Sequence, residues 1–169
     1  MRDSVREITN SPNLEILDYT LVDLSPFYLE RARKNHADYS RFKSRSSSLP
    51  STSVSYVQGN GESLSMASDS FDVVICMYTF HELPPSARAN FAKEMSRLAK
   101  KGGLIVFTDS IQKGDRPVLD DSIGAFKEFN EPFYGTYIEE DVGKLFEQEG
   151  VERVEKWLLS VTKTLTFKK

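Results

Sequence analysis

Residues 71–77 read Phe-Asp-Val-Val-Ile-Cys-Met, and this stretch indicates the fold class most directly. Every position except Asp72 is apolar, and the run is too short for a typical helix. A nearly continuous apolar run of this length is typical of a strand that is covered on both faces of a parallel sheet. We therefore expect a central strand here, within an α/β protein.

Strands and helices alternate on both sides of this stretch. The further strands that we expect cover residues 14–22, 54–58 and 104–107, with two more after Gly150. Ser25 and Pro26 predict a helix to about residue 37, because serine caps free amides and proline suits the first helical position. A second helix should begin at Pro84 and Pro85 and end at Lys100-Lys101-Gly102-Gly103, where cations and glycine favour a helix end.

The C-terminal third predicts two more helices and a pair of strands. One helix should cover about 118–129, and the capping-box spacing of Thr136 and Glu139 predicts another over 137–149. The last two strands are joined closely at residues 157–160, which favours an antiparallel pair at the edge of a mainly parallel sheet. In the final strand, Lys163 shares a face with Leu159, Val161, Leu165 and Phe167.

Composition limits the classes of partner. The 169 residues are 39% hydrophobic and 28% charged, which suits one soluble domain, 1–169. The net charge of -3 gives no positive field to attract nucleic acid, so we expect a small-molecule partner. We find no membrane-spanning or secretory segment, and the single cysteine, Cys76, suits a reducing compartment, so the expected location is cytoplasmic. Residues 40–53, with seven serines, should form a flexible loop.

Four segments carry a family resemblance in the order and spacing that the family uses. They are Leu21-Val22-Asp23-Leu24-Ser25-Pro26, Gln58-Gly59-Asn60-Gly61-Glu62-Ser63-Leu64, Phe71-Asp72-Val73-Val74 with Phe80-His81-Glu82-Leu83, and Leu98-Ala99-Lys100-Lys101-Gly102-Gly103-Leu104. On these segments the chain resembles class I S-adenosylmethionine-dependent methyltransferases, especially those that methylate small molecules and quinone-like lipids. The resemblance covers about residues 14–169. It implies a Rossmann-like sheet, S-adenosylmethionine as cofactor, and a small acceptor that is aromatic or lipid-like.

The resemblance implies an adenosine site on the first two segments. Asp23 would bind the ribose hydroxyls, Leu24 would pack against the adenine, and Asn60 with Gly61 would contact the adenine edge. Asn60 stands where the family usually has an acidic residue, and its carbonyl oxygen keeps the acceptor while removing the charge. The alternatives are that Asp23 caps the following helix and that Asn60-Gly61 is simply a turn.

The third segment implies residues near the transferred methyl group. The backbone around Cys76 and Met77 would border the cofactor, and His81 could be a general base, although a packing role for this histidine is the alternative. The proposed substrate pocket comprises Tyr78, Phe133, Tyr134 and Tyr137, with Phe126 and Phe129 nearby in the sequence. We predict no metal site. Methyl transfer from a sulfonium depends mainly on alignment and exclusion of water.

One family feature is missing before Asp23. The family begins with a strand, a Gly-x-Gly-x-Gly turn and a first helix, and residues 3–10 resemble only the remnant of that helix. Because the first strand lies between those ending at Asp23 and Met77 in the family, its absence predicts two unpaired strand edges. The chain could be truncated, the two strands could close up, or another chain could supply a strand, as in a homo-oligomer. The alternatives to a methyltransferase are a non-catalytic methyltransferase-like fragment or interaction module and, less favoured, a nicotinamide-dependent dehydrogenase.

Overall fold

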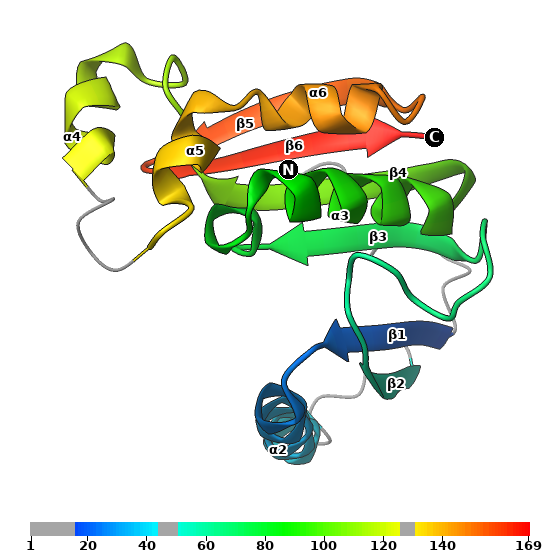
Figure 1. Ribbon diagram of the computed structural model, residues 1–169. Helices are drawn as coiled ribbons and strands as arrows, with labels where there is room; N and C mark the ends of the chain where they lie inside the picture. Colours follow the sequence, from blue (N-terminus) through cyan, green and yellow to red (C-terminus); the bar gives the residue numbers. More distant parts are fainter. Residues whose placement is uncertain (1–15, 44–50, 126–130) are drawn as a thin grey trace. The chain divides into compact units, whose positions relative to one another are not determined.

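The computed structural model describes residues 16–43, 51–125 and 131–169. The chain divides into two compact units, Met1–Gly61 and Glu62–Lys169, and each is described by itself. Hydrogen-bonded strands form one sheet in each unit (Figure 1). The sequence-based expectation of a single domain stays a prediction.

The first unit contains two parallel strands and the helix that connects them. These elements are β1 (Ile16–Asp23), α2 (Pro26–Lys43) and β2 (Ser51–Gln58). Ser25 precedes the helix, and its Oγ accepts a hydrogen bond from the Tyr28 amide at 3.4 Å, as expected for a capping serine. The helix is longer than predicted, so both ends of the expected 40–53 loop belong to regular structure. Residues 44–50 lie outside the described part, and the flexibility of the loop stays a prediction.

The second unit is built on a four-stranded mixed sheet in the order β3-β4-β6-β5. Its strands are β3 (Phe71–Met77), β4 (Ala99–Ser110), β5 (Glu152–Leu159) and β6 (Thr162–Lys168). β3 and β4 are parallel, whereas β6 is antiparallel to both of its neighbours. The predicted antiparallel C-terminal pair is therefore confirmed. The connecting turn lies at Ser160 and Val161, slightly later than predicted.

β3 does not occupy the predicted central place in its sheet. Among the described residues it pairs only with β4, and β1 pairs only with β2. Within the described part of the chain, one edge of β1 and one edge of β3 therefore have no partner strand, as predicted. Ile75 and Met77 are each 58% exposed on one face of β3, whereas Cys76 is buried on the other. The apolar run indicated a strand correctly, but its position depends on a neighbour that the described residues do not supply.

Helices cover one face of the four-stranded sheet. α3 (Pro85–Leu98) and α6 (Val142–Glu147) lie along it, and η1 (Phe80–Glu82) follows β3 (Figure 1). The core beneath them is aromatic: the Phe146 ring stacks on Phe167 at 4.6 Å, and Phe80 meets Phe107 edge-on at 4.9 Å between centroids. These four side chains are completely buried. Offset and edge-on pairs of this kind are the preferred arrangements of aromatic rings.

Two helix predictions need correction. The expected helix over 137–149 is broken into α5 (Tyr134–Glu139) and α6, and the capping residue is Asp141, whose Oδ1 accepts from the Gly143 amide at 3.1 Å. Thr136 does not cap a helix; its hydroxyl donates to the Phe133 carbonyl at 2.8 Å inside α5. Sequence spacing alone could not distinguish a cap from this bond within a helix.

The other differences concern element ends. The expected helix over 118–129 is represented by η2 (Pro117–Leu119) and the short α4 (Asp120–Gly124), and residues 126–130 lie outside the described part. α3 ends at Leu98 because β4 begins at Ala99, so the lysines and glycines expected to end the helix already belong to the strand.

Candidate active site

A histidine and a buried aspartate meet where β3 and β4 end. Asp109 is completely buried at the end of β4, and its Oδ1 lies 2.6 Å from Nδ1 of His81 in η1. The same oxygen accepts from the Ser110 amide at 2.7 Å, and Oδ2 accepts from the Phe80 amide at 2.9 Å. Because an ionised carboxylate only accepts hydrogen bonds, Nδ1 carries the proton and Nε2 is the open nitrogen of His81.

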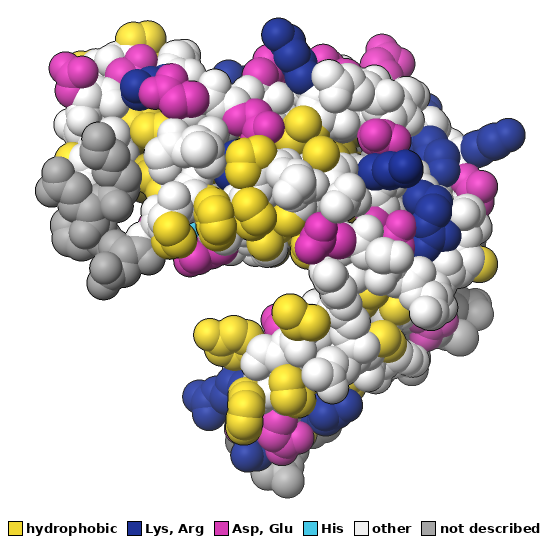
Figure 2. All heavy atoms as spheres, viewed as in Figure 1, with side chains coloured by type: hydrophobic (Ala, Val, Ile, Leu, Met, Phe, Trp, Pro, Cys, Tyr) yellow, Lys and Arg dark blue, Asp and Glu magenta, His cyan; other side chains and the backbone are white. Residues whose placement is uncertain are grey.

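The surroundings of His81 favour a positive charge on it. The hydrogen bond to Asp109 raises the pKa of His81, and this effect outweighs the opposing effect of burial. Nε2 lies 3.6 Å from Oε1 of Glu82, and the Tyr134 and Tyr137 rings meet the imidazole edge-on at 6.4 and 6.2 Å. The side chain is 14% exposed. On the face drawn in Figure 2, hydrophobic side chains gather near α5, and only a trace of histidine surface appears among them.

The predicted acceptor residues fall into two environments. Tyr78 is 51% exposed, in a left-handed backbone conformation (φ 50°), and its hydroxyl is 2.8 Å from the Thr162 hydroxyl. Phe133 is half-buried and Tyr134 is buried. Tyr137 is completely buried and donates to the Ser110 carbonyl at 2.6 Å, so it supports the site from the core and does not line an open pocket. Phe126 and Phe129 lie outside the described residues.

Cys76 and Met77 differ sharply in exposure. Cys76 is buried on the helix-covered face, and burial raises the pKa of its thiol to about 11. A thiol with this pKa is almost entirely protonated near neutrality and is therefore a poor nucleophile. Met77 ends β3 with its side chain exposed, where open α/β sheets bind ligands.

The predicted adenosine residues lie together in the first unit. Asp23 ends β1, and its Oδ1 accepts from the Ser25 amide at 2.8 Å. The Asp23 carbonyl accepts from the Gly59 amide at 3.1 Å, which brings the segment leading to Asn60 and Gly61 next to Asp23. Leu24, the next residue in the chain, is 67% exposed. A carboxylate with remaining acceptor capacity beside an exposed apolar side chain fits a ribose and an adenine ring.

The alternative role of Asp23 was to cap the following helix, and its Oδ1 accepts from the amide of Ser25, the residue before α2. This hydrogen bond is compatible with ribose binding because one carboxylate can accept several hydrogen bonds. The cofactor contacts of Asp23, Leu24, Asn60, Gly61, Cys76 and Met77 stay a prediction, as do the base role of His81 and the acceptor contacts. The first four belong to the first unit and the last two to the second.

Sequence reasoning missed Asp109 as the partner of His81. A signal was present, since Thr108-Asp109 follows the apolar run Leu104–Phe107, and a carboxylate at the end of a buried strand needs a partner. The β3–β4 register sets Met77 opposite Thr108, which brings the residues after each strand together. Only this pairing reveals that His81 is the partner.

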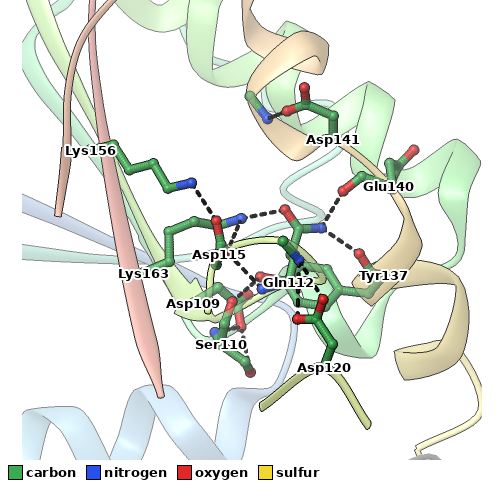
Figure 3. Close-up of polar contacts among 12 residues, drawn as sticks. Asp109, Ser110, Gln112, Asp115, Asp120, Tyr137, Glu140, Asp141, Lys156 and Lys163 are labelled. Atoms are coloured by element: carbon green, nitrogen blue, oxygen red, sulfur yellow. Dashed lines mark hydrogen bonds and ion pairs between the residues drawn. The ribbon is translucent and has the colours of Figure 1, made fainter. Parts of the chain in front are cut away.

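A second polar cluster lies under β6 and was also missed. Lys163 Nζ is 3.0 Å from Oδ2 of Asp115, whose Oδ1 is 2.5 Å from Lys156 Nζ (Figure 3). Gln112 accepts from Lys163 and donates to the carbonyls of Tyr137 and Glu140. Burial lowers the pKa of Lys163, and the nearby carboxylate of Asp115 opposes this effect. The cluster joins β6 to the segments before α4 and α6, which is a structural role.

Comparisons with known proteins agree with this architecture. A sequence profile of the family described as "Methyltransferase domain" matches residues 7–107, more than half of the chain. The uncharacterized methyltransferase YcgJ of Bacillus subtilis is 32% identical over 79 residues, which are 47% of this chain and 30% of that protein. The match therefore spans less than a third of this curated relative.

Solved structures show the same fold. YcgJ of Bacillus subtilis has a TM-score of 0.57 at 18% identity, with 94% of this chain and 73% of that chain covered. A SAM-dependent methyltransferase from Methanosarcina mazei has a TM-score of 0.64 at 15% identity, with 90% and 91% covered. One from Aquifex aeolicus has a TM-score of 0.62 at 14% identity, with 98% and 87% covered.

The chain belongs to the methyltransferase domain family. The resemblance carried by the four segments and the Rossmann-like α/β fold class are thereby confirmed. Membership indicates S-adenosylmethionine as the cofactor. Within the described part of the chain, no helix combines the length and the apolar character that a membrane crossing requires.

Proposed function

We propose that the protein is an S-adenosylmethionine-dependent methyltransferase that acts on a small acceptor of aromatic or lipid-like character. The observation that carries this proposal is the match of the methyltransferase family to residues 7–107, together with Asp23 at the end of β1. Asp23, Leu24 and the 59–61 segment supply the hydrogen-bonding groups and the apolar surface that an adenosine needs. His81 and its aromatic neighbours in the second unit support an acceptor side there.

The apolar side chains after β3 support an aromatic or lipid-like acceptor. Met77 and Tyr78 supply exposed apolar surface after β3, whereas the Tyr134 and Tyr137 rings beside the imidazole are buried and support it from the core. Flat or apolar molecules gain most from such a surface, because burial of apolar area contributes roughly 25 cal/mol per Å². Methyl transfer from a sulfonium then requires the acceptor atom to be aligned with the methyl group in a site that excludes water.

The first test is calorimetric titration of the full chain with S-adenosylmethionine and S-adenosylhomocysteine. We expect micromolar binding, and Asp23→Ala should weaken it by about 1 kcal/mol or more, the scale of a charge-assisted hydrogen bond. Asp18→Ala is the matched control, because Asp18 is an exposed aspartate on the same strand, away from its carboxyl end. It should leave the affinity unchanged within a factor of about two.

The outcomes separate the proposal from its alternative. Binding that depends on Asp23 but not on Asp18 supports a methyltransferase, and the search then moves to aromatic and lipid-like acceptors. A folded chain that binds neither compound contradicts the proposal and favours a non-catalytic module of the same family. Such a module could use the unpaired edges of β1 and β3 to associate, which sedimentation would detect as a homo-oligomer.

A further inference from the structure

Three potential metal ligands converge beside the His81–Asp109 pair. His81 and Glu82 come from η1, and Glu131 lies shortly before α5. Each offers one ligand atom, and these atoms all lie within 4.8 Å of one another. His81 Nε2 and Glu82 Oε1 are 3.6 Å apart, close to the roughly 3 to 4 Å between ligands that share an ion with bonds of about 2.1 Å.

Among the described residues, the imidazole of His81 is the cationic group that faces the two glutamates. In residues 16–43, 51–125 and 131–169, no lysine or arginine forms an ion pair with Glu82 or Glu131. The buried carboxylate of Asp109 adds a further negative charge on the other side of the imidazole. A divalent ion bound at Nε2 would replace the proton there and set two positive charges, in place of one, among the three carboxylates, which lowers their mutual repulsion further.

Asp109 holds His81 in the orientation that a metal ligand requires. Metal-ligating histidines usually donate their second ring N–H to a carboxylate or a carbonyl, which fixes the tautomer and makes the ligating nitrogen more basic. Here Nδ1 is 2.6 Å from Asp109, which is itself fixed by the amides of Phe80 and Ser110. Nε2 is therefore the nitrogen directed to Glu82, and Asp109 is the hydrogen-bond partner that orients the ligating histidine in many metal sites.

We propose that His81, Glu82 and Glu131 bind a divalent transition-metal cation. One imidazole and two carboxylates suit Zn²⁺ and Mn²⁺, and three protein ligands leave coordination positions for water or an acceptor oxygen. In this arrangement His81 acts as a ligand and not as the general base considered from the sequence. A catalytic use of the cation, to orient and acidify an acceptor hydroxyl, rests on the proposed function, whereas cation binding does not.

Electron paramagnetic resonance with Mn²⁺ and calorimetry with Zn²⁺ test the site in the full chain, in buffer without chelators. We expect one ion per chain. Glu131→Gln should weaken binding by at least about 10-fold, because it removes the charge of one ligand at constant size, and Asp109→Asn should weaken it by about 10- to 100-fold. Glu152→Gln is the matched control, because Glu152 is exposed at the start of β5, outside the cluster, and it should bind as the wild type does.

Thermal unfolding of each variant shows whether it is folded before its affinity is interpreted. No binding of Mn²⁺ or Zn²⁺ by the folded wild type up to about 1 mM overturns the proposal. Equal weakening, or none, in Glu131→Gln and Glu152→Gln also overturns it, because the ions would then bind without a defined site. Titration of metal-free protein with S-adenosylmethionine separates the metal-site proposal from the proposed function. If the protein binds metal but does not bind S-adenosylmethionine, only the methyltransferase function is contradicted.

Discussion

Asp115→Asn should destabilise the protein strongly at neutral pH and much less at alkaline pH. Asp115 is the counter-ion of the buried Lys163, at 3.0 Å, and it also accepts from the Gln112 amide at 2.7 Å (Figure 3). Asparagine keeps one acceptor oxygen but removes the charge. Leaving a buried charge without its partner costs about 3 to 5 kcal/mol. Lys163 would then be the uncompensated charge.

Lys163 limits this cost because it can release its proton. Deprotonating a lysine with a reference pKa of about 10.4 costs about 4 kcal/mol at pH 7.5 and about 1 kcal/mol at pH 9.5. In the variant, the pKa of Lys163 is lower in the folded than in the unfolded state. At a pH between these two pKa values, the unfolded state therefore binds more protons than the folded state. Stability therefore rises with pH in this window. The wild type changes in the same direction but less, because Asp115 opposes the lowering of the pKa of Lys163 by burial.

Urea unfolding followed by circular dichroism should thus give a loss of about 3 to 4 kcal/mol near pH 7.5 and below about 1.5 kcal/mol near pH 9.5. Lys156→Ala is the control: it removes the other ion pair of Asp115, but its side chain is 42% exposed, so we expect about 1 kcal/mol or less. The double variant Asp115→Asn/Lys163→Met should regain much of the loss. A loss under about 1 kcal/mol at neutral pH, or an equal loss at both pH values, would contradict the role of Asp115 as a buried counter-ion.

Two further predictions concern the sheet of the second unit. Gly103→Ala should lower the free energy of unfolding by about 2 kcal/mol or more, because a Cβ there would lie 2.8 Å from the Lys100 carbonyl oxygen. Gly102→Ala, at φ 78° with open space around it, should lower it by only about 1 kcal/mol, through backbone strain. A larger loss in Gly102→Ala than in Gly103→Ala would contradict the contact argument. Cys76 should react with an aromatic disulfide at pH 8 about 100-fold more slowly in the native than in the unfolded protein, because burial raises the pKa of its thiol to about 11. Reaction rates of the native and unfolded protein that differ by less than about tenfold would argue against this burial.

Elements whose start or type is set by residues close together in the sequence could be predicted from the sequence alone. Ser25-Pro26 predicted the start of α2, Pro84-Pro85 predicted the start of α3, and the apolar run 71–77 predicted β3, because caps, proline and apolar runs act within a few residues. The four family segments likewise sufficed to identify the methyltransferase family and the Rossmann-like class. Even locally, the spacing of Thr136 and Glu139 was misleading, because the same pattern fits a cap and a helix interior.

Which distant residues meet was decided by tertiary contacts alone. The register between β3 and β4 brings His81 to Asp109, and the chain before α5 brings Glu131 to the same place. The local pattern hinted that Asp109 needs a partner, but it identified neither His81 nor Glu131. The edge position of β3 and the burial of Lys163 against Asp115 also depend on how strands pair. Local propensities are set by nearby residues, whereas these partners are selected by burial, where an unpaired charge is too costly to persist.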